Sequence, residues 1–342
     1  MRINVFKFLL QKLNMRSEIL AVVFGVALIV LVSGCVQTPG FGGKGATGGE
    51  GIVVNVFQPT LASIRSGEDI AFHIEVQNTG GYDNAPVVAE LTGINAQDWQ
   101  VYNKFLDLGR IAAPDPETGT SGGTSTGDWV GKAPMLRKGQ VMTYNPIARV
   151  YYYYETYATK PVWFVTSDEL RRIVQTGSSL ESKPTENTKA PVKVEIKTGN
   201  FIRSSNWQNA KFNVEFKIIN DGNGLIAGKD YPVYVEVSYP DGITPVGQCP
   251  PTRITATGIY ENIPSGVSYP TFGTPVRLWN GKETSFTCEF QITNPPTNRE
   301  LREFRVKLGY VYYTDIETSI QVTGTEEGFI CCLLYTSPSP RD

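Results

Sequence analysis

Histidine is nearly missing from this chain of 342 residues, which contains only His73. A zinc site built on two or more histidines is therefore excluded within this sequence. His73 lies in the run Phe72-His-Ile-Glu-Val76, where apolar residues alternate and His73 shares the opposite face with Glu75. Such alternation is typical of a strand with one buried face. We expect His73 to be a sheet-surface residue rather than a ligand or a general base.

An excess of charge of one sign is also missing. Lys and Arg number 31 and Asp and Glu number 33, so the formal net charge is -2. Domains that bind nucleic acid carry a basic excess, so we expect no nucleic-acid partner. Asp115 and Glu117 lie close together, but their Pro- and Gly-containing segment favours a solvated loop over a calcium site or a glycosidase pair. We expect no metal site, no cofactor and no enzymatic activity.

No apolar run reaches the roughly 20 residues that a membrane-spanning helix needs. The longest, Ile19 to Val32, follows a basic segment and is followed by Ser33-Gly-Cys35. A short apolar run between a basic segment and small residues is typical of a cleaved signal peptide. An uncleaved N-terminal membrane helix is an alternative, and an ordinary cleaved signal is another.

The segment Leu31-Val-Ser-Gly-Cys35 resembles the lipobox of a lipoprotein signal peptide. The resemblance implies cleavage before Cys35, attachment of membrane lipid to Cys35, and an extracytoplasmic protein on the outer face of the cell membrane. Residues 1–34 would then be the signal peptide and its helix, and residues 35–51 a lipidated cysteine with a Gly-rich tether. Stable anchoring would need more than one acyl chain.

Two of the five cysteines belong to an unusual C-terminal segment. The run Cys332-Leu-Leu-Tyr-Thr-Ser-Pro-Ser-Pro-Arg-Asp342 resembles one translated frame of a widely used transposase sequencing adapter. We expect residues 332–342 to be an adapter artefact, Cys331 to be partly adapter-encoded, and the natural protein to continue differently. The alternative is a disordered Pro- and Ser-containing tail.

Cys249 and Cys288 remain as an even pair, which suits an oxidising compartment. Cys288 alternates in phase with Phe286 and Phe290 and is expected to point into a core, whereas Cys249 lies in a Pro-rich loop. We predict a disulfide that fastens this loop to the sheet. Two free buried thiols are the alternative.

The chain repeats a strand-rich pattern. Tyr, Phe, Thr and Val are common, which favours strands, and both copies break at Asn-x-Gly, a turn signal. Tyr152 and Tyr154 of the first copy match Tyr310 and Tyr312 of the second. The matched segments are Phe72–Gly80 with Phe212–Gly222, Pro86–Leu91 with Pro232–Val237, Lys138-Gly139 with Asn280-Gly281, and Arg149–Thr156 with Lys307–Thr314.

Short alternating strands separated by turn signals predict an all-β protein built as two tandem β-sandwiches. The two copies resemble the immunoglobulin-like, cell-adhesion-related repeats of archaeal and bacterial surface proteins. We expect domain 1 over residues 52–177, a linker over 178–190 and domain 2 over 191–331. One short helix is predicted over 167–175, because Thr166-Ser-Asp-Glu169 reads as a capping box and Gly177 as a stop signal.

Four consecutive tyrosines, Tyr151 to Tyr154, offer the one candidate binding surface. Strand alternation assigns Tyr152 and Tyr154 to the core and Tyr151 and Tyr153 to the outside. The outward pair is expected near Trp163 on the following strand, where aromatic rings could stack on a glycan or dock a protein. We favour instead packing of the pair under a loop or against the other domain, with the binding surface as the competing interpretation.

These expectations combine into a non-enzymatic, membrane-anchored surface lipoprotein that serves as an interaction or structural module of the cell envelope. Its partners would be membrane lipid through Cys35 and a protein or glycan. The alternative is an accessory subunit that holds a substrate or partner for a membrane transport or secretion system. A third possibility is a hydrolase whose catalytic domain follows this sequence.

Overall fold

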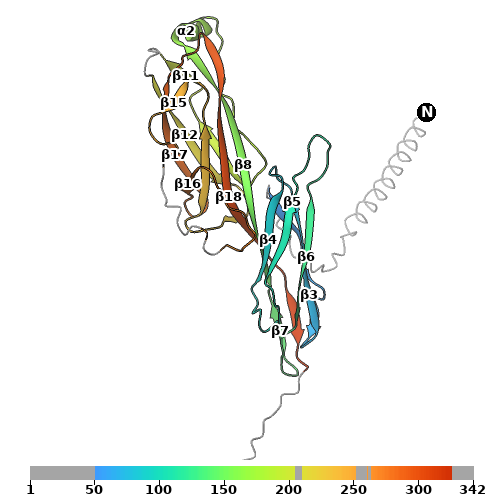
Figure 1. Ribbon diagram of the computed structural model, residues 1–342. Helices are drawn as coiled ribbons and strands as arrows, with labels where there is room; N and C mark the ends of the chain where they lie inside the picture. Colours follow the sequence, from blue (N-terminus) through green and yellow to red (C-terminus); the bar gives the residue numbers. More distant parts are fainter. Residues whose placement is uncertain (1–50, 205–209, 252–259, 261–262, 326–342) are drawn as a thin grey trace, which may run out of the picture. The chain divides into compact units, whose positions relative to one another are not determined.

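The computed structural model describes residues 51–204, 210–251, 260 and 263–325, and within them nearly every regular element is a β-strand (Figure 1). The all-β prediction is therefore confirmed. The strands are β1 (Ile52–Pro59), β2 (Ser63–Arg65), β3 (Asp69–Asn78), β4 (Ala85–Thr92), β5 (Phe105–Ile111), β6 (Thr124–Lys132), β7 (Val141–Tyr144), β8 (Ile147–Thr166), β9 (Glu186–Asn187), β10 (Val192–Lys197), β11 (Phe201–Ser204), β12 (Lys211–Asn220), β13 (Leu225–Ile226), β14 (Pro232–Ser238), β15 (Ile243–Pro245), β16 (Thr274–Arg277), β17 (Glu283–Ile292), β18 (Arg299–Glu317) and β19 (Ile320–Thr323).

Both halves of the chain use the same strand order. In the first half, β1-β3-β6 form one sheet while β5-β4-β8 form part of another. In the second half, β10-β12-β17-β15 and β16-β14-β18 repeat that plan. Alternate residues are buried along strands such as β3 and β17. Inward rings from the two sheets therefore meet, and Phe290 and Phe304 pack with their ring centroids 5.4 Å apart. This is the layered packing of a β-sandwich.

One antiparallel ladder joins the two halves. Strand β8 pairs with β18 from Ile147 opposite Glu317 to Val165 opposite Arg299, so that β16-β14-β18-β8-β4-β5 is one continuous path (Figure 1). Within this ladder Tyr153 lies opposite Val311. The matched tyrosines cross over, since Tyr154 faces Tyr310 and Tyr152 faces Tyr312. Equivalent residues that exchange partners in this way define a local two-fold relation between the halves.

The two halves also exchange strands at their margins. Strand β19, at the end of the second half, pairs with β2 and β7 of the first, while β9 and β11 pair with β8. The buried apolar residues of both halves form one continuous cluster that runs from Ile52 to Val322. In the sequence, the expected linker 178–190 lies between two sets of strands. In space, one sheet and one apolar core include strands from both sides of this linker.

One segment of the proposed repeat is matched wrongly. Lys138-Gly139 precedes β7, which pairs with β19, but Asn280-Gly281 precedes β17, which pairs with β12. The counterpart of β17 is β6, because β6 pairs with β3 as β17 pairs with β12. A Gly-containing turn ahead of a strand is a common local signal, and only the strand pairing shows which turns are equivalent.

The short helix forms where it was expected. Helix α2 (Ser167–Gln175) begins after Thr166, whose hydroxyl accepts a hydrogen bond from the Glu169 amide at 3.0 Å. The Glu169 carboxylate does not complete the capping box; it binds the Arg172 guanidinium through two hydrogen bonds. The helix ends at Gln175 with Thr176 as its C-cap, and the next residue, Gly177, has a φ of 70°, a left-handed conformation that favours glycine.

The expected signal peptide 1–34, Cys35, and the adapter-like residues 332–342 lie outside the described residues. Within the part that is described, no helix is long and apolar enough to cross a membrane.

Candidate functional site

Tyr151 and Tyr153, the candidate binding pair, do not face solvent. They are 7% and 6% exposed and belong to a small apolar cluster with Val88, Ala227 and Val267. The expectation of an open aromatic surface is therefore wrong. Alternation placed the two rings correctly on the face opposite the main core, but segments of the second half cover that face. The favoured interpretation, packing against another part of the chain, describes their position.

The hydroxyl of Tyr153 is fully engaged in a buried polar cluster. It donates a hydrogen bond of 2.6 Å to Glu155, whose second oxygen accepts one from Tyr157 at 2.6 Å and lies 3.1 Å from the Lys307 ammonium. Burial raises the pKa of Tyr153 well above its usual value, and the nearby Glu155 carboxylate raises it further. The phenol therefore stays neutral and donates within β8, while the contact between Glu155 and Lys307 links β8 to β18.

Trp163 does not join the two tyrosines. It lies on β8 itself, not on a following strand, and faces Leu301 of β18 and Phe201 of β11. Its ring is partly exposed, and the Arg299 guanidinium lies 5.9 Å from the ring centre. Tyr151, Tyr153 and Trp163 thus do not form one binding surface.

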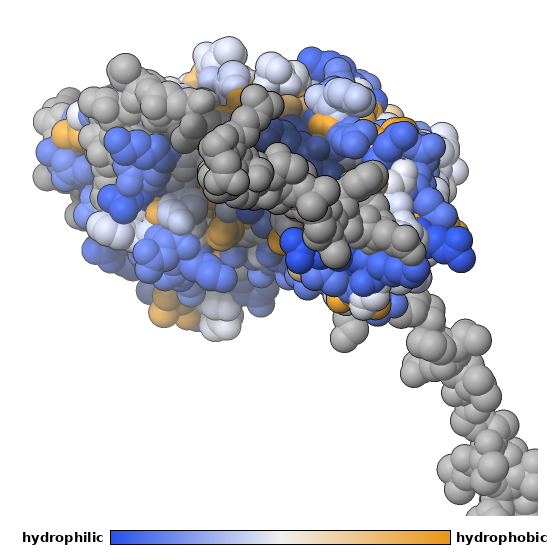
Figure 2. Space-filling view, turned by 90° about the horizontal axis from the view of Figure 1, so that it is seen from below, coloured by the Kyte–Doolittle hydropathy of each residue, from blue (hydrophilic) through white to orange (hydrophobic). Residues whose placement is uncertain are grey.

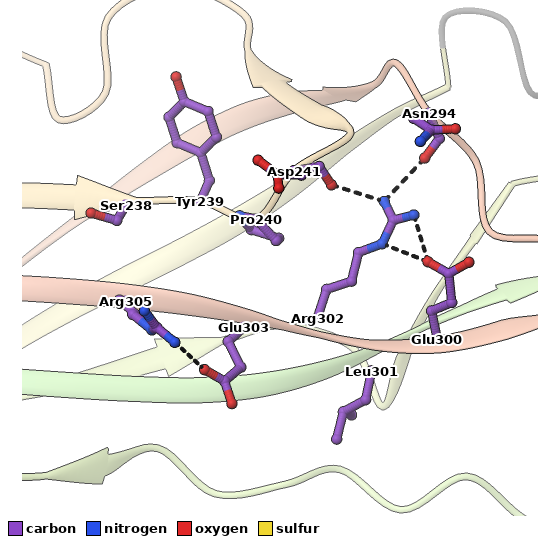
Figure 3. Close-up of a pocket in the computed structure, with 10 residues that line it drawn as sticks. All are labelled: Ser238, Tyr239, Pro240, Asp241, Asn294, Glu300, Leu301, Arg302, Glu303 and Arg305. Atoms are coloured by element: carbon purple, nitrogen blue, oxygen red, sulfur yellow. Dashed lines mark hydrogen bonds and ion pairs between the residues drawn. The ribbon is translucent and has the colours of Figure 1, made fainter.

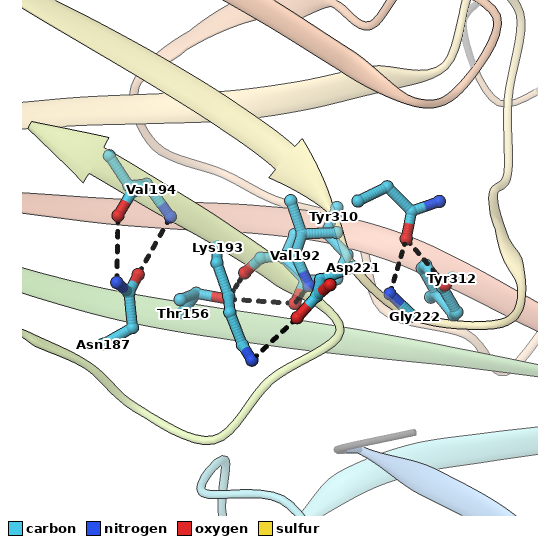
Figure 4. Close-up of polar contacts among 10 residues, drawn as sticks. Thr156, Asn187, Val192, Lys193, Val194, Asp221, Gly222, Tyr310 and Tyr312 are labelled. Atoms are coloured by element: carbon cyan, nitrogen blue, oxygen red, sulfur yellow. Dashed lines mark hydrogen bonds and ion pairs between the residues drawn. The ribbon is translucent and has the colours of Figure 1, made fainter. Parts of the chain in front are cut away.

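The inward tyrosines organise a polar corner in each half, as Figure 4 shows in part for the second. Tyr154 donates a hydrogen bond to the side-chain oxygen of Asn78, and Tyr312 donates one to Asn220. Each hydroxyl also accepts a backbone N–H, from Tyr82 and Gly224 respectively. The corners were not predicted, although the repeated Asn-x-Gly and the matched tyrosines carried the signal.

The glycines of Asn-x-Gly have a steric reason in both corners. A Cβ atom on Gly80 would collide with the Tyr154 hydroxyl, and one on Gly222 would collide with that of Tyr312. The sequence repeat therefore records the close approach of a tyrosine hydroxyl to the backbone. The Asn-x-Gly repeat therefore has a structural role at these turns and does not indicate a ligand site.

Cys249 and Cys288 are joined by a disulfide with Cα atoms 5.7 Å apart. Cys288 lies on β17 and is 3% exposed, with the buried rings of Phe286 and Phe290 on the same face. The bond fastens the loop after β15 to the sandwich core.

The candidate polar residues have structural partners. His73 is half-buried on the outer face of β3, and its Nδ1 lies 2.9 Å from the Asp128 carboxylate on β6. Asp115 accepts hydrogen bonds from the Thr118 hydroxyl and the Glu117 amide, which lower the pKa of its carboxyl. In the described part of the chain no group of three or more His, Cys, Asp or Glu is placed to hold a metal ion.

The loop Gly119-Thr-Ser-Gly-Gly123 has the spacing of a nucleophile elbow, G-x-S-x-G. An elbow needs a strand, a sharp turn and a helix, but this loop leads into strand β6. A Cβ atom on Gly122 would collide with the Asn78 carbonyl oxygen. The glycine allows the loop to pack on the Asn78 corner, so the spacing has a structural explanation.

A hollow of about 560 Å³ lies beside the start of β18 (Figure 3). Its most buried charge is Arg302, which donates to Glu300 at 2.7 Å and to the carbonyls of Asp241 and Asn294. Arg305 pairs with Glu303 at 2.9 Å. Both arginines are paired with carboxylates, and the Asp241 carboxylate has no ion pair among the described residues, so the hollow offers no uncompensated positive charge to an anion.

A second hollow, of about 700 Å³, lies between β8, β10 and the segment before β9. Four lysines line it: Lys160, Lys183, Lys193 and Lys197. Lys193 pairs with Asp221 at 3.0 Å, as Figure 4 shows, and Lys197 lies 3.8 Å from Glu195. Of the two hollows, this lysine-lined hollow has the larger excess of charge, and the excess is positive.

Where Figure 2 shows coloured residues, the surface is mostly hydrophilic and its apolar residues form small separate spots.

The sequence matches no protein-family model. It is also similar to no curated protein. Among solved structures, a mutant alpha-2-macroglobulin from Salmonella is 10% identical with a TM-score of 0.21, over 80% of this chain and 16% of that one. The C-terminal globular domain of an oligosaccharyltransferase from Pyrococcus abyssi is 9% identical with a TM-score of 0.20, over 78% of this chain and 46% of that one. This chain thus spans less than half of either structure, and scores this low carry no argument about function.

Proposed function

We propose that this protein is a non-enzymatic surface lipoprotein, anchored on the outer face of a cell membrane, in which two immunoglobulin-like sandwiches act as one structural or interaction module. The lipobox-like segment ending at Cys35 supports the anchor. The disulfide between Cys249 and Cys288 supports an oxidising, extracytoplasmic setting.

The single observation that carries the structural role is the β8–β18 ladder. It joins the halves through residues Arg299 to Glu317 and buries the tyrosine hydroxyls against partners within the chain. A shared sheet and a shared core leave no hinge at the 178–190 boundary through which the sandwiches could move as separate domains. A rigid module behind a Gly-rich tether is suited to presenting a surface at a distance from the membrane.

The anchor is tested with Cys35→Ser and the matched control Gln37→Ala in the full chain, expressed in a host that processes lipoproteins. We expect a labelled fatty acid to enter the wild type and the control but not Cys35→Ser, and Cys35→Ser to leave the membrane fraction. Membrane retention of Cys35→Ser without cleavage would instead establish an N-terminal membrane helix. Release of the wild type in soluble form would contradict the anchor.

The lysine-lined hollow favours a second candidate, an accessory subunit that holds an anionic solute for a transport or secretion system. A transporter or secretion component that co-purifies with the full chain after crosslinking would support this role. Its absence in crosslinked membranes would favour the structural module.

A further inference from the structure

Lys160 occupies a position that strand alternation reserves for core residues. It lies on the row of β8 that includes Ala158, Val162 and Phe164, all at most 2% exposed, and it pairs in register with the fully buried Phe304. Lys160 itself is 7% exposed. A lysine is rarely so buried without a partner.

The ammonium group of Lys160 has no ion-pair or hydrogen-bond partner among the residues that the structure describes. The nearest electrostatic influence is Glu195, which itself lies beside Lys197. Burial lowers the pKa of Lys160, with Glu195 partly opposing the effect. The ammonium is not among the fully buried atoms that lack a partner, so it reaches water in the hollow, where an entering ligand would meet it.

The wall around Lys160 is positively charged. Lys183 has no carboxylate within ion-pair distance in the described part of the chain, so two of the four lysines remain uncompensated. Glu195 is the one acidic residue in the described lining.

The segment that closes the hollow is held firmly. Thr185 and Asn187 each exchange two hydrogen bonds with β10, at the backbone of Ile196 and Val194 respectively (Figure 4 shows the second pair). These side chains take the place of a neighbouring strand along the edge of β10. The hollow is therefore a formed feature of the fold, with one wall from the long ladder and the other from this segment.

We infer that the hollow is a binding site for a small anion bearing a carboxylate or phosphate group, with Lys160 as the buried counter-charge and Lys183 at the rim. A bound oxyanion would accept charge-assisted hydrogen bonds from the Lys160 ammonium. It would thereby give the Lys160 ammonium a negatively charged partner, which none of the residues described by the structure provides. The inference does not depend on membrane anchoring.

The test is isothermal titration calorimetry of the purified full chain with inorganic phosphate and, separately, with citrate at constant ionic strength. We expect at least one of them to bind the wild type and Lys160→Met to bind it at least about tenfold more weakly, since a charge-assisted hydrogen bond is lost. Phosphate binding alone would identify a phosphate-bearing ligand class, and citrate binding alone a carboxylate class.

Two further variants keep the result interpretable. Lys104→Met removes a surface lysine that pairs with Glu90 in the first half and should bind as the wild type does. Lys183→Ala alters an exposed rim residue without touching the core, and it should weaken binding even if Lys160→Met folds poorly. No binding of either anion by the wild type, or unchanged binding in both Lys160→Met and Lys183→Ala, would overturn the proposal.

Discussion

Tyr312 donates a hydrogen bond of 2.8 Å to Asn220, and the same pairing recurs at 3.1 Å between Tyr154 and Asn78. Each tyrosine comes from a strand of the central ladder, and each asparagine ends the strand that packs across from it. The asparagine amide in turn donates to two backbone carbonyls of neighbouring turns. One side-chain pair thus connects both sheets of a sandwich with its turns.

We expect Tyr154→Phe and Tyr312→Phe each to lower the free energy of unfolding by about 1–3 kcal/mol. Loss of the hydroxyl leaves the partly buried backbone N–H of Tyr82 or Gly224 without its acceptor. Urea denaturation measures the effect, with Tyr102→Phe as the control because Tyr102 is 97% exposed. A cost no larger than that of Tyr102→Phe would show that the corners are dispensable.

The shared sheet predicts a single cooperative unfolding transition. Phe286→Ala in the second core should cost about 3–5 kcal/mol and should shift the unfolding of the first half equally. Trp99 and Trp129, both 1% exposed in the first half, report that shift by fluorescence when Trp163, Trp207 and Trp279 are replaced by Phe. Fluorescence that stays at the wild-type midpoint would mean that the halves unfold independently.

Reduction of the Cys249–Cys288 bond should weaken the fold. It closes a loop with a sequence separation of 39 residues, for which the chain-entropy relation gives about 4 kcal/mol. Urea midpoints with and without reductant measure the change, and the double variant Cys249→Ser with Cys288→Ser should not respond to reductant. Alkylation of both cysteines in the native, unreduced protein would argue against the bond.

Stability should fall at alkaline pH because buried tyrosines resist ionisation. Burial raises the pKa of Tyr312 to about 12, whereas an unfolded tyrosine ionises near pH 10. The contribution of neutral Tyr312 to the free energy of unfolding is complete below pH 10. It is lost as the pH rises toward 12, because the unfolded chain then releases a proton that the folded chain keeps. The difference between the folded and unfolded pKa of Tyr312 corresponds to about 3 kcal/mol of unfolding free energy.

Urea denaturation between pH 8 and pH 12 in wild type and Tyr312→Phe checks this contribution. The variant should lose stability less steeply over that range, although other buried tyrosines such as Tyr152 and Tyr310 act in the same direction. Tyr102→Phe should keep the wild-type slope. If the unfolding free energy fell equally steeply with pH in the wild type and in Tyr312→Phe, the Tyr312 phenol would have no part in the loss of stability at alkaline pH.

Local signals determined much of the fold. Alternation along Phe72–Val76 and its repeat fixed which side chains enter the core, and Thr166 and Gly177 set the ends of helix α2, because these features depend on neighbouring residues alone. The inward placement of Tyr152, Tyr154 and Cys288 followed from the same period of two. The sequence by itself therefore decided strands, faces and caps.

Only the tertiary structure decided what lies against each face. Tyr151 and Tyr153 were correctly assigned to the second face of their strand, yet long-range pairing of β8 with β18 and the cover from the second half buried them. Lys160 was unremarkable in sequence because its burial arises from β10 and the residues before β9. Register between distant strands depends on contacts across the whole chain, and those contacts turned two repeated segments into one sheet with a charged hollow at its edge.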